Sequence, residues 1–387
     1  MKIAADEAQR QATALDEHRI RQVNIKRVRN RYPRLYGKNS KRPEHGYGYE
    51  MKMVELITDQ GALGWGSQND AAVWKTPYRM DLPRLKEAFL GKKVSELFHP
   101  EVGVLVPEAT QIEFALHDLA GKILEMPVYA MLGSVEQERV PCYDGAIYFN
   151  DISPDSRPGG VQAILEDCRQ DEALGYRDFK VKIGRGGKWM PFEEGLQRDI
   201  EVIRLIRQHY PERKILVDAN DAYTLPGLLR FLEGVVDCDL FWIEEPFIEN
   251  REDFLRLKEY LSRKSPQTLI ADGESDPDID LLIRLADEKL LDVFLMDIEG
   301  FGFTRWRQIL PQIKEKGYLI SPHNWGSKLK THYTAHLARA CKNAITIEGV
   351  PDLTEGVEFD GYQLIDGQMV VPDRPGFGMD FIWGLEQ

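Results

Sequence analysis

The segment 215–274 carries ILVDAN at 215–220, LFWIEEP at 240–246 and LIADGE at 269–274. Each is a short apolar run that ends in acidic or amide residues. The stretches between them have apolar residues at helical spacing, as in LPGLLRFLEGVV at 225–236. Buried apolar strands that alternate with helices indicate an α/β architecture built on a parallel sheet.

The pattern extends in both directions from this segment. FKVKIG at 179–184 precedes it, and VFLMDIE at 293–299, LISPHNW at 319–325 and AITIEG at 344–349 follow it, while RVPCYDGAIY at 139–148 is also rich in strand-forming residues. Polar residues stand near the ends of six runs, 23 to 30 residues apart: Asp218, Glu244, Glu274, Asp297, His323 and Glu348. One βα unit of a (β/α)8 barrel takes roughly 31 residues, and barrel active sites are built at the C-terminal ends of the strands. A dinucleotide-binding site is disfavoured, because Trp189 stands where the third glycine of that loop is needed.

A barrel accounts for about 250 of the 387 residues. Before it, MKMVELITDQGALGWGSQ at 51–68 predicts two strands and a turn, and PEATQIEFALHDLAGKILEMPVYAML at 107–132 predicts a long helix and a short one. Strands followed by helices indicate an α+β domain. We expect three parts: an N-terminal domain at 1–135, a barrel at 136–360, and a C-terminal segment at 361–387 that returns to the N-terminal domain.

The composition excludes several classes of protein. Asp and Glu outnumber Lys and Arg by 63 to 50, a net charge of −13, whereas nucleic-acid binding needs a basic surface. No apolar run is long enough to span a membrane, and the N-terminus is too charged for a secretion signal. The four cysteines form no C-x-x-C pair. We expect a cytoplasmic protein with neither nucleic-acid nor membrane partners.

Three acidic residues predict a metal site. Asp218, Glu244 and Glu274 end consecutive strands, and three like charges in one barrel mouth repel unless a cation holds them. Oxygen ligands without Cys or His favour Mg²⁺, with Mn²⁺ possible. Three independent salt bridges are the alternative explanation. Strand alternation predicts that Glu245 points to the face opposite Glu244, as a structural carboxylate or one that supports the metal ligands from outside.

Lys180 and Lys182 lie two apart on one strand and therefore face the same side. Two close ammonium groups lower each other's pKa, and a lysine lowered in this way can act as a base. His323 and Asp297 end adjacent strands, so the carboxylate can orient the imidazole and raise its basicity.

Two more strand ends carry candidate substrate contacts. Asn220 shares a face with Asp218 and is expected to hydrogen bond to substrate, and Glu348 could donate a proton or bond a developing oxyanion. His332 and His336 have the spacing of H-E-x-x-H, but position 333 is Tyr, so we expect surface or interface histidines rather than metal ligands.

At this point the chain resembles the enolase superfamily, mandelate racemase subgroup. The resemblance is carried by KVKIG, VDAN, WIEEP, GE, an Asp on strand six, the PH of SPHNW and TIEG in order through 139–387, and by the helix at 112–133. It implies a modified TIM barrel, (β/α)7β, with an α+β capping domain made from the N-terminal region and the C-terminal tail. Residues 1–20 and 30–48 lack a clear counterpart.

The resemblance also implies roles for the candidate residues. Asp218, Glu244 and Glu274 would bind Mg²⁺. Lys182 and the His323–Asp297 pair would be acid/base groups on opposite faces of the substrate. Lys180 would contact the substrate carboxylate and lower the pKa of Lys182, and Glu348 would bond the enolate. Strand six lacks the lysine of the muconate-cycloisomerising branch, which argues against that branch.

These roles point to removal of the proton α to a carboxylate, and we favour β-elimination of water from a sugar acid, an aldonate or aldarate, to a 2-keto-3-deoxy acid. Nine basic residues and no acidic one lie between Arg21 and Arg42, with tyrosines and glycines interspersed. A mobile lid of this composition, with Arg34 and Lys38 among its substrate contacts, suits a polyhydroxylated anion. A basic arm that docks on an acidic neighbouring subunit is the alternative, and we expect a homo-oligomer.

Three other functions stay open at this stage. A racemase or epimerase of a 2-hydroxy acid would use the same site. A barrel lyase that forms a Schiff base on Lys182 would need no metal. A barrel without catalysis would only bind a sugar acid.

Overall fold

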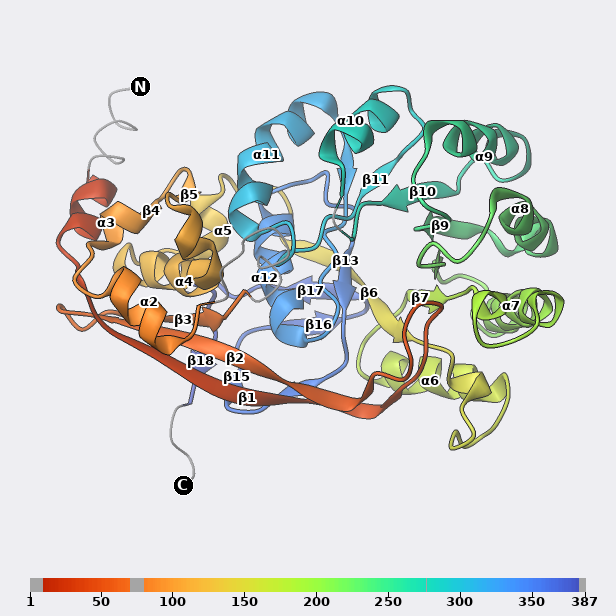
Figure 1. Cartoon of the computed structure of the whole chain (residues 1–387), viewed down its shortest axis with the longest axis horizontal. Coiled ribbons are helices and arrows are strands. Elements are labelled where there is room, and N and C mark those ends of the chain that lie inside the picture. The colour runs from red at the N-terminus through yellow and green to blue at the C-terminus, as the bar shows by residue number, and fades with distance from the viewer. Residues whose placement is uncertain (1–9, 70–79, 276, 383–387) are drawn as a thin grey trace.

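The computed structural model describes residues 10–69, 80–275 and 277–382. Its centre is a barrel of eight parallel strands (Figure 1): β6 (Arg139–Ile147), β7 (Phe179–Lys182), β8 (Ile215–Asp218), β9 (Leu240–Glu244), β10 (Leu269–Asp272), β11 (Val293–Phe294), β12 (Leu319–Ile320) and β13 (Ile347–Gly349). Strands β6 to β12 pair in chain order, and β13 pairs with β6. An isolated bridge between Ile320 and Ala344 joins the last two strands.

Seven helices follow the first seven strands and surround them: α6 (Gln162–Ala173), α7 (Phe192–His209), α8 (Leu225–Gly234), α9 (Arg251–Lys264), α10 (Ile279–Asp287), α11 (Phe303–Lys316) and α12 (Lys328–Arg339). Local sequence explains their limits; for example, Asn250 caps α9, whose Phe254 and Leu257 are buried. The expected (β/α)7β barrel is confirmed. No helix in the described ranges is long and apolar enough to cross a membrane.

Strands β11 and β12 are shorter than the apolar runs that predicted them. The chain leaves the regular ladder early, although Leu295 N still bonds Asp272 O and His323 N bonds Leu295 O. Asp297 and His323 therefore lie on the segments beyond the strands, at the barrel mouth.

The capping unit is an antiparallel sheet covered by helices. Strands β1 (Ile20–Tyr36), β2 (Gly46–Thr58) and β3 (Leu63–Ser67) pair in order, and β14 (Leu353–Thr354) joins β1. Its helices are α2 (Leu82–Phe89), α3 (Val94–Leu97), α4 (Glu113–Ile123) and α5 (Val128–Met131), and a small hairpin joins β4 (Phe98–His99) to β5 (Gly103–Val104). Gly64 lets α4 approach β3, because a Cβ there would stand 2.3 Å from Leu119 Cβ.

The C-terminal segment joins the two parts. Strands β16 (Gln363–Ile365) and β17 (Gln368–Val370) extend the sheet beside β6, and β15 (Val357–Glu358) pairs with β18 (Asp380–Phe381). Phe377 N bonds Asp118 on α4, and the Phe381 ring stacks on Trp65 of β3. The expected N-terminal domain (1–135) includes residues 1–9 and 70–79, and the expected C-terminal segment (361–387) includes residues 383–387. These stretches lie outside the described residues.

His332 and His336 are buried, so the expected surface position is wrong. His336 accepts a hydrogen bond from Tyr129 N and lies 2.7 Å from Tyr362 Oη, while His332 stacks on the Tyr362 ring. The C-terminal segment covers this face of α12, which the local sequence could not indicate. All four cysteines are buried and free.

Candidate active site

A cavity of about 530 Å³ lies at the C-terminal ends of the barrel strands and is bordered by residues 37–49 of the capping unit. Its barrel side includes Tyr148, Lys182, Asn220, Glu274, Asp297, His323 and Trp325, and its capping side is formed by Asn39, Lys41, Arg42, His45 and Tyr49. The tip of the β1–β2 pair reaches the barrel next to β7 and β8 (Figure 1), where Ser40 Oγ bonds Ala219 O and Trp189 Nε1 bonds Asn39 O.

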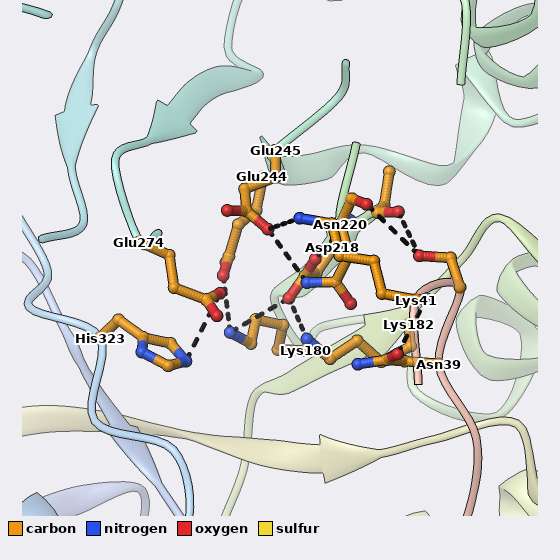
Figure 2. A network of polar contacts seen from close by, with 12 residues as sticks. Asn39, Lys41, Lys180, Lys182, Asp218, Asn220, Glu244, Glu245, Glu274 and His323 are labelled. Atoms are coloured by element: carbon orange, nitrogen blue, oxygen red, sulfur yellow. Dashed lines mark hydrogen bonds and ion pairs between the residues drawn. The ribbon is translucent and has the colours of Figure 1, made fainter. Parts of the chain in front are cut away.

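Asp218, Glu244 and Glu274 lie close together (Figure 2), with one oxygen from each within 4.8 Å of the others, and Glu274 lines the cavity. The parallel register places Asp218 beside Glu244 at the ends of β8 and β9. Glu274 follows Gly273, whose φ of 108° turns the chain inward after β10. The sequence prediction that these three carboxylates converge agrees with this geometry.

The donor set fits a hard divalent cation. All three groups offer carboxylate oxygen, the ligand type that Mg²⁺ and Mn²⁺ prefer. Glu274 Oε2 is buried and makes no hydrogen bond within the described chain. Burial, only partly offset by Lys180, raises the pKa of Glu244 well above its usual range. A divalent cation would give Glu274 Oε2 a partner and would stabilise the charged form of Glu244.

Lys182 and Lys180 project from β7 toward these carboxylates (Figure 2). Lys182 bonds Asp218 and lines the cavity. Lys180 is fully buried, with its Nζ 2.7 Å from Glu244 Oε1 and 2.9 Å from Glu348 Oε1. Lys180 is not among the described residues that line the cavity, and its contact with the substrate carboxylate stays a prediction.

The expected lowering of the lysine pKa is also corrected. Burial and Lys180 lower the pKa of Lys182, but Asp218, Glu274 and Glu244 raise it by more, and the net pKa lies above the ordinary value. Each lysine faces more carboxylate than ammonium. Lys180 lowers the pKa of Lys182, as expected, but the carboxylates raise it by more.

His323 and Asp297 form a hydrogen-bonded pair, with 2.8 Å between His323 Nδ1 and Asp297 Oδ2. The other oxygen of Asp297 accepts the backbone N–H groups of Glu299 and Gly300, which fixes the carboxylate. His323 Nε2 lies 3.4 Å from Glu274 Oε2, on the metal-ligand side. Burial lowers the pKa of His323, but Glu274, Glu348 and Asp297 raise it to about 9.

Glu348 lies within β13 and is completely buried. Burial raises its pKa, but Lys180 and His323 lower it by more, so the group is ionised and holds Lys180. Its two expected roles, proton donation and bonding of a developing oxyanion, stay predictions.

Glu245 does not point away from the site as strand alternation predicted. Its φ of 39° is left-handed, because β9 ends at Glu244 and the chain turns there. Glu245 Oε2 accepts a hydrogen bond from Asn220 Nδ2 at 3.0 Å and lies 3.7 Å from Lys41 Nζ. Asn220 is itself left-handed, with φ 44°, and lines the cavity.

Arg34 and Lys38 do not lie among the described cavity-lining residues. Arg34 is buried on strand β1 and pairs with Asp167 at 2.9 Å and Asp171 at 2.5 Å. These pairs give it a structural role, and its contact with substrate stays a prediction. Lys38 Nζ lies over the Trp189 ring, 5.1 Å from its centre, and 3.9 Å from Glu44. Most of the basic segment forms strand β1 rather than a lid, and residues 37–45 alone connect it to β2.

Sequence reasoning named the capping segment with Lys41, Arg42 and Tyr49, which line the cavity, but it missed Asn39 and His45. His45 stands between Tyr148 and Trp325, with ring centroids 4.9 and 4.3 Å away. Its Nε2 is buried without a hydrogen bond in the described chain, and burial together with Lys182 and Arg42 lowers its pKa to about 4. The neighbouring glycines at 46 and 48 signalled a turn but not which side chains it would present.

A family model described as "Enolase C-terminal domain-like" matches residues 163–383. Galacturonate dehydratase from Geobacillus sp., complexed with D-galacturonate and 5-keto-4-deoxy-D-galacturonate, is 31% identical, covers 95% of each chain and has a TM-score of 0.85. A mutant of the same enzyme complexed with Mg is 30% identical, covers 95% of this chain and 93% of that one, and has a TM-score of 0.86.

Two curated relatives are more distant. D-Xylonate dehydratase of Haloferax volcanii is 24% identical over 86% of this chain and 83% of its own. The L-Lys-D/L-Arg epimerase of Methylococcus capsulatus is 26% identical over 89% of this chain and 87% of its own. Magnesium-dependent removal of a proton α to a carboxylate is the chemistry that the carboxylate triad and these similarities support. The chain belongs to the enolase superfamily, in its mandelate racemase/muconate lactonizing subgroup.

Proposed function

We propose that this protein is a sugar-acid dehydratase that takes the proton α to a carboxylate and expels the β-hydroxyl as water. The observation that carries the proposal is the placement of two acid/base groups at the triad. Lys182 contacts Asp218, and His323 lies 3.4 Å from Glu274, so the two groups flank the three carboxylates while both line the cavity.

Asp218, Glu244 and Glu274 would hold Mg²⁺, which supplies positive charge to the substrate carboxylate and to the charge that develops when the α proton leaves. Carboxylates that bind a divalent cation would raise the pKa of Lys182 and His323 less. The one of these two groups that is then neutral would accept the α proton, and the other, protonated, is placed to protonate the departing hydroxyl. Asp297 keeps the His323 ring oriented and favours its protonated form. Glu348 keeps Lys180 charged and in place beneath the triad.

A polyhydroxylated acid suits the polar lining of the cavity, where Asn220 and His45 each leave a buried polar atom without a hydrogen bond. The similarity to dehydratases of galacturonate and xylonate supports uronates and aldonates as the first acids to test, with aldarates next. Racemisation or epimerisation is the second candidate, favoured by the similarity to an amino-acid epimerase and by the two flanking acid/base groups.

The test is a screen of D-galacturonate, D-xylonate, arabinonate and aldaric acids with Mg²⁺, with keto-deoxy acid formation measured by semicarbazide absorbance. We expect turnover that EDTA abolishes and Mg²⁺ restores. α-Proton exchange into deuterated water without a keto product would show racemisation instead. Full activity in EDTA, with borohydride trapping at Lys182, would establish a Schiff-base lyase and overturn the proposal. Binding without turnover or exchange would leave a sugar-acid binder.

A cytoplasmic location, assembly into a homo-oligomer and the division at residues 135 and 360 stay predictions of the sequence.

A further inference from the structure

A second cavity, of about 450 Å³, lies where strand β1 of the capping unit meets helix α12 and the C-terminal segment (Figure 1). Cavities of this size hold small molecules in other proteins. None of the described residues that line it lines the active-site cavity. Most of its wall is aromatic or apolar, and includes Tyr32, Tyr176, Phe359, Tyr362, Leu364 and Met369.

His332 brings an unpaired polar atom to this wall. The residue is 2% exposed, and its Nδ1 is buried without a hydrogen-bond partner in the described chain. Its ring stacks on Tyr362, with 3.8 Å between the centroids, and meets Phe359 edge-on at 4.7 Å. Burial, Lys328 and His336 hold its pKa well below the ordinary range, so the neutral imidazole offers one donor and one acceptor nitrogen. A ligand that bonds to this imidazole would remove the cost of an unpaired buried group.

Lys328 adds a positive charge one helical turn before His332, on the same face of α12. Its Nζ lies 5.7 Å from the centre of the Phe359 ring. This ammonium group makes no hydrogen bond or ion pair with any side chain of the described residues. The wall therefore offers a cation and a neutral imidazole next to aromatic rings.

The other charged groups of the wall also favour an anion. Arg31 is exposed and pairs with Glu355 at 2.5 Å. Asp352 is the one acidic residue among the described residues of the wall, and both of its oxygens already have donors: the Lys328 backbone N–H at 2.8 Å and Thr354 Oγ1 at 3.3 Å. Burial raises the pKa of Asp352 to about 7, so this carboxyl group is only partly ionised at neutral pH. The Lys328 ammonium is left to bind a carboxylate from outside the chain.

We infer that this cavity binds a small aromatic carboxylate that carries a hydrogen-bonding group on its ring. The ring lies among the aromatic side chains, the carboxylate pairs with Lys328, and the ring substituent bonds to His332. A sugar acid is poorly suited to this wall, because most of its hydroxyl groups would face apolar side chains. The inference does not depend on the proposed function, since the two cavities share no described residue.

Calorimetric titration with 4-hydroxybenzoate, indole-3-acetate and benzoate tests the inference without turnover. We expect the first two acids to bind about tenfold more tightly than benzoate, because benzoate has no group for His332. The affinities should be the same in EDTA and in Mg²⁺. An acid that bound at the carboxylate triad would need the cation, so this comparison separates the two cavities.

Two variants assign the contacts. Lys328→Met should weaken all three acids about tenfold and leave the affinity for neutral 4-hydroxybenzamide unchanged. His332→Phe keeps a ring on Tyr362 and should remove the advantage of 4-hydroxybenzoate over benzoate. Lys316→Met is the matched control, because Lys316 pairs with Asp287 at the surface, outside the cavity. Unfolding temperatures establish that each variant is folded.

The absence of saturable binding by all three acids would overturn the inference. Binding that requires Mg²⁺, or that both variants leave unchanged, would also overturn it, because the acid would then lie elsewhere. A second copy of this chain is the alternative occupant, since Leu353 at the cavity is 61% exposed. In that case the acids would bind only after Leu353→Asp dissociates the assembly in sedimentation velocity, and the cavity would be an interface.

Discussion

Replacement of Arg34 by methionine separates a structural role from substrate binding. The guanidinium contacts Asp171 through Nη1 and Nη2 at 2.6 and 2.5 Å, Asp167 through Nε at 2.9 Å, and the carbonyl of Ala146 at 3.3 Å. Methionine keeps much of the length and apolar volume but removes the charge and all of these contacts. Two buried carboxyl groups then lose their cation.

Removal of one partner from a buried ion pair costs about 3–5 kcal/mol. With an unfolding entropy of about 2.1 cal/mol/K per residue over 387 residues, that loss lowers the unfolding temperature by about 4–6 °C. Burial already raises the pKa of Asp167 to about 7 although Arg34 lowers it, so removal of Arg34 raises it further. A carboxyl group with a raised folded-state pKa loses stability as pH rises toward that pKa. The difference from wild type should therefore be larger at pH 8.5 than at pH 6.

The assay is thermal unfolding by circular dichroism at both pH values, with kcat and KM measured below the transition. We expect the lower unfolding temperature with KM within about twofold of wild type. A KM raised tenfold with an unfolding temperature unchanged at both pH values would refute the reasoning and return Arg34 to the substrate site. Arg27→Met is the matched control, because Arg27 lies on the same strand and its pair with Glu50 is exposed.

Four further outcomes follow from the site. Glu274→Gln should raise the Mg²⁺ concentration needed for half-maximal activity at least tenfold, measured by metal titration after EDTA treatment, and an unchanged requirement would remove Glu274 from the ligand set. Asp297→Asn should move the pH–rate profile of His323 to lower pH, because Asp297 raises the pKa of that imidazole; a profile that stays in place would contradict the pairing. His45→Phe should raise KM about tenfold with little change in kcat, since it keeps a ring between Tyr148 and Trp325 but loses Nε2; equal kinetics would exclude a substrate contact. Of Lys182→Met and His323→Asn, the variant that loses α-proton exchange into deuterated water identifies the initial base, and exchange retained by both would place the base elsewhere.

Much of this architecture could be predicted from the sequence, because the apolar runs that form strands and the recurrence of βα units are local properties of the chain. Apolar runs of strand length recur once per βα unit, and in a parallel barrel their C-terminal ends share one rim. That rule alone brings Asp218, Glu244 and Glu274 together. It also places His323 next to Asp297, because consecutive strands are neighbours.

Tertiary structure decided what lies beyond the strand ends. Glu245 and Asn220 take left-handed backbone conformations, so strand alternation, on which the prediction for Glu245 depended, no longer applies after β8 and β9 end. The protonation of Lys182 follows from how many carboxylates surround it, which depends on four separate strands.

In the capping unit, too, local sequence decided some features and tertiary structure decided others. Its strands and helices are local patterns, and the sequence by itself predicted a basic segment near the substrate, of which Lys41 and Arg42 line the cavity. Whether Arg34 or His45 reaches the cavity depends on pairing between residues far apart in the chain: Arg34 finds Asp171 on α6, whereas His45 follows the turn into the barrel mouth. Local periodicity decided the secondary structure elements and the metal-binding rim. Long-range charge pairing and turns of the chain decided which side chains face the cavity, because pairing and turns depend on neighbours that no local sequence pattern contains.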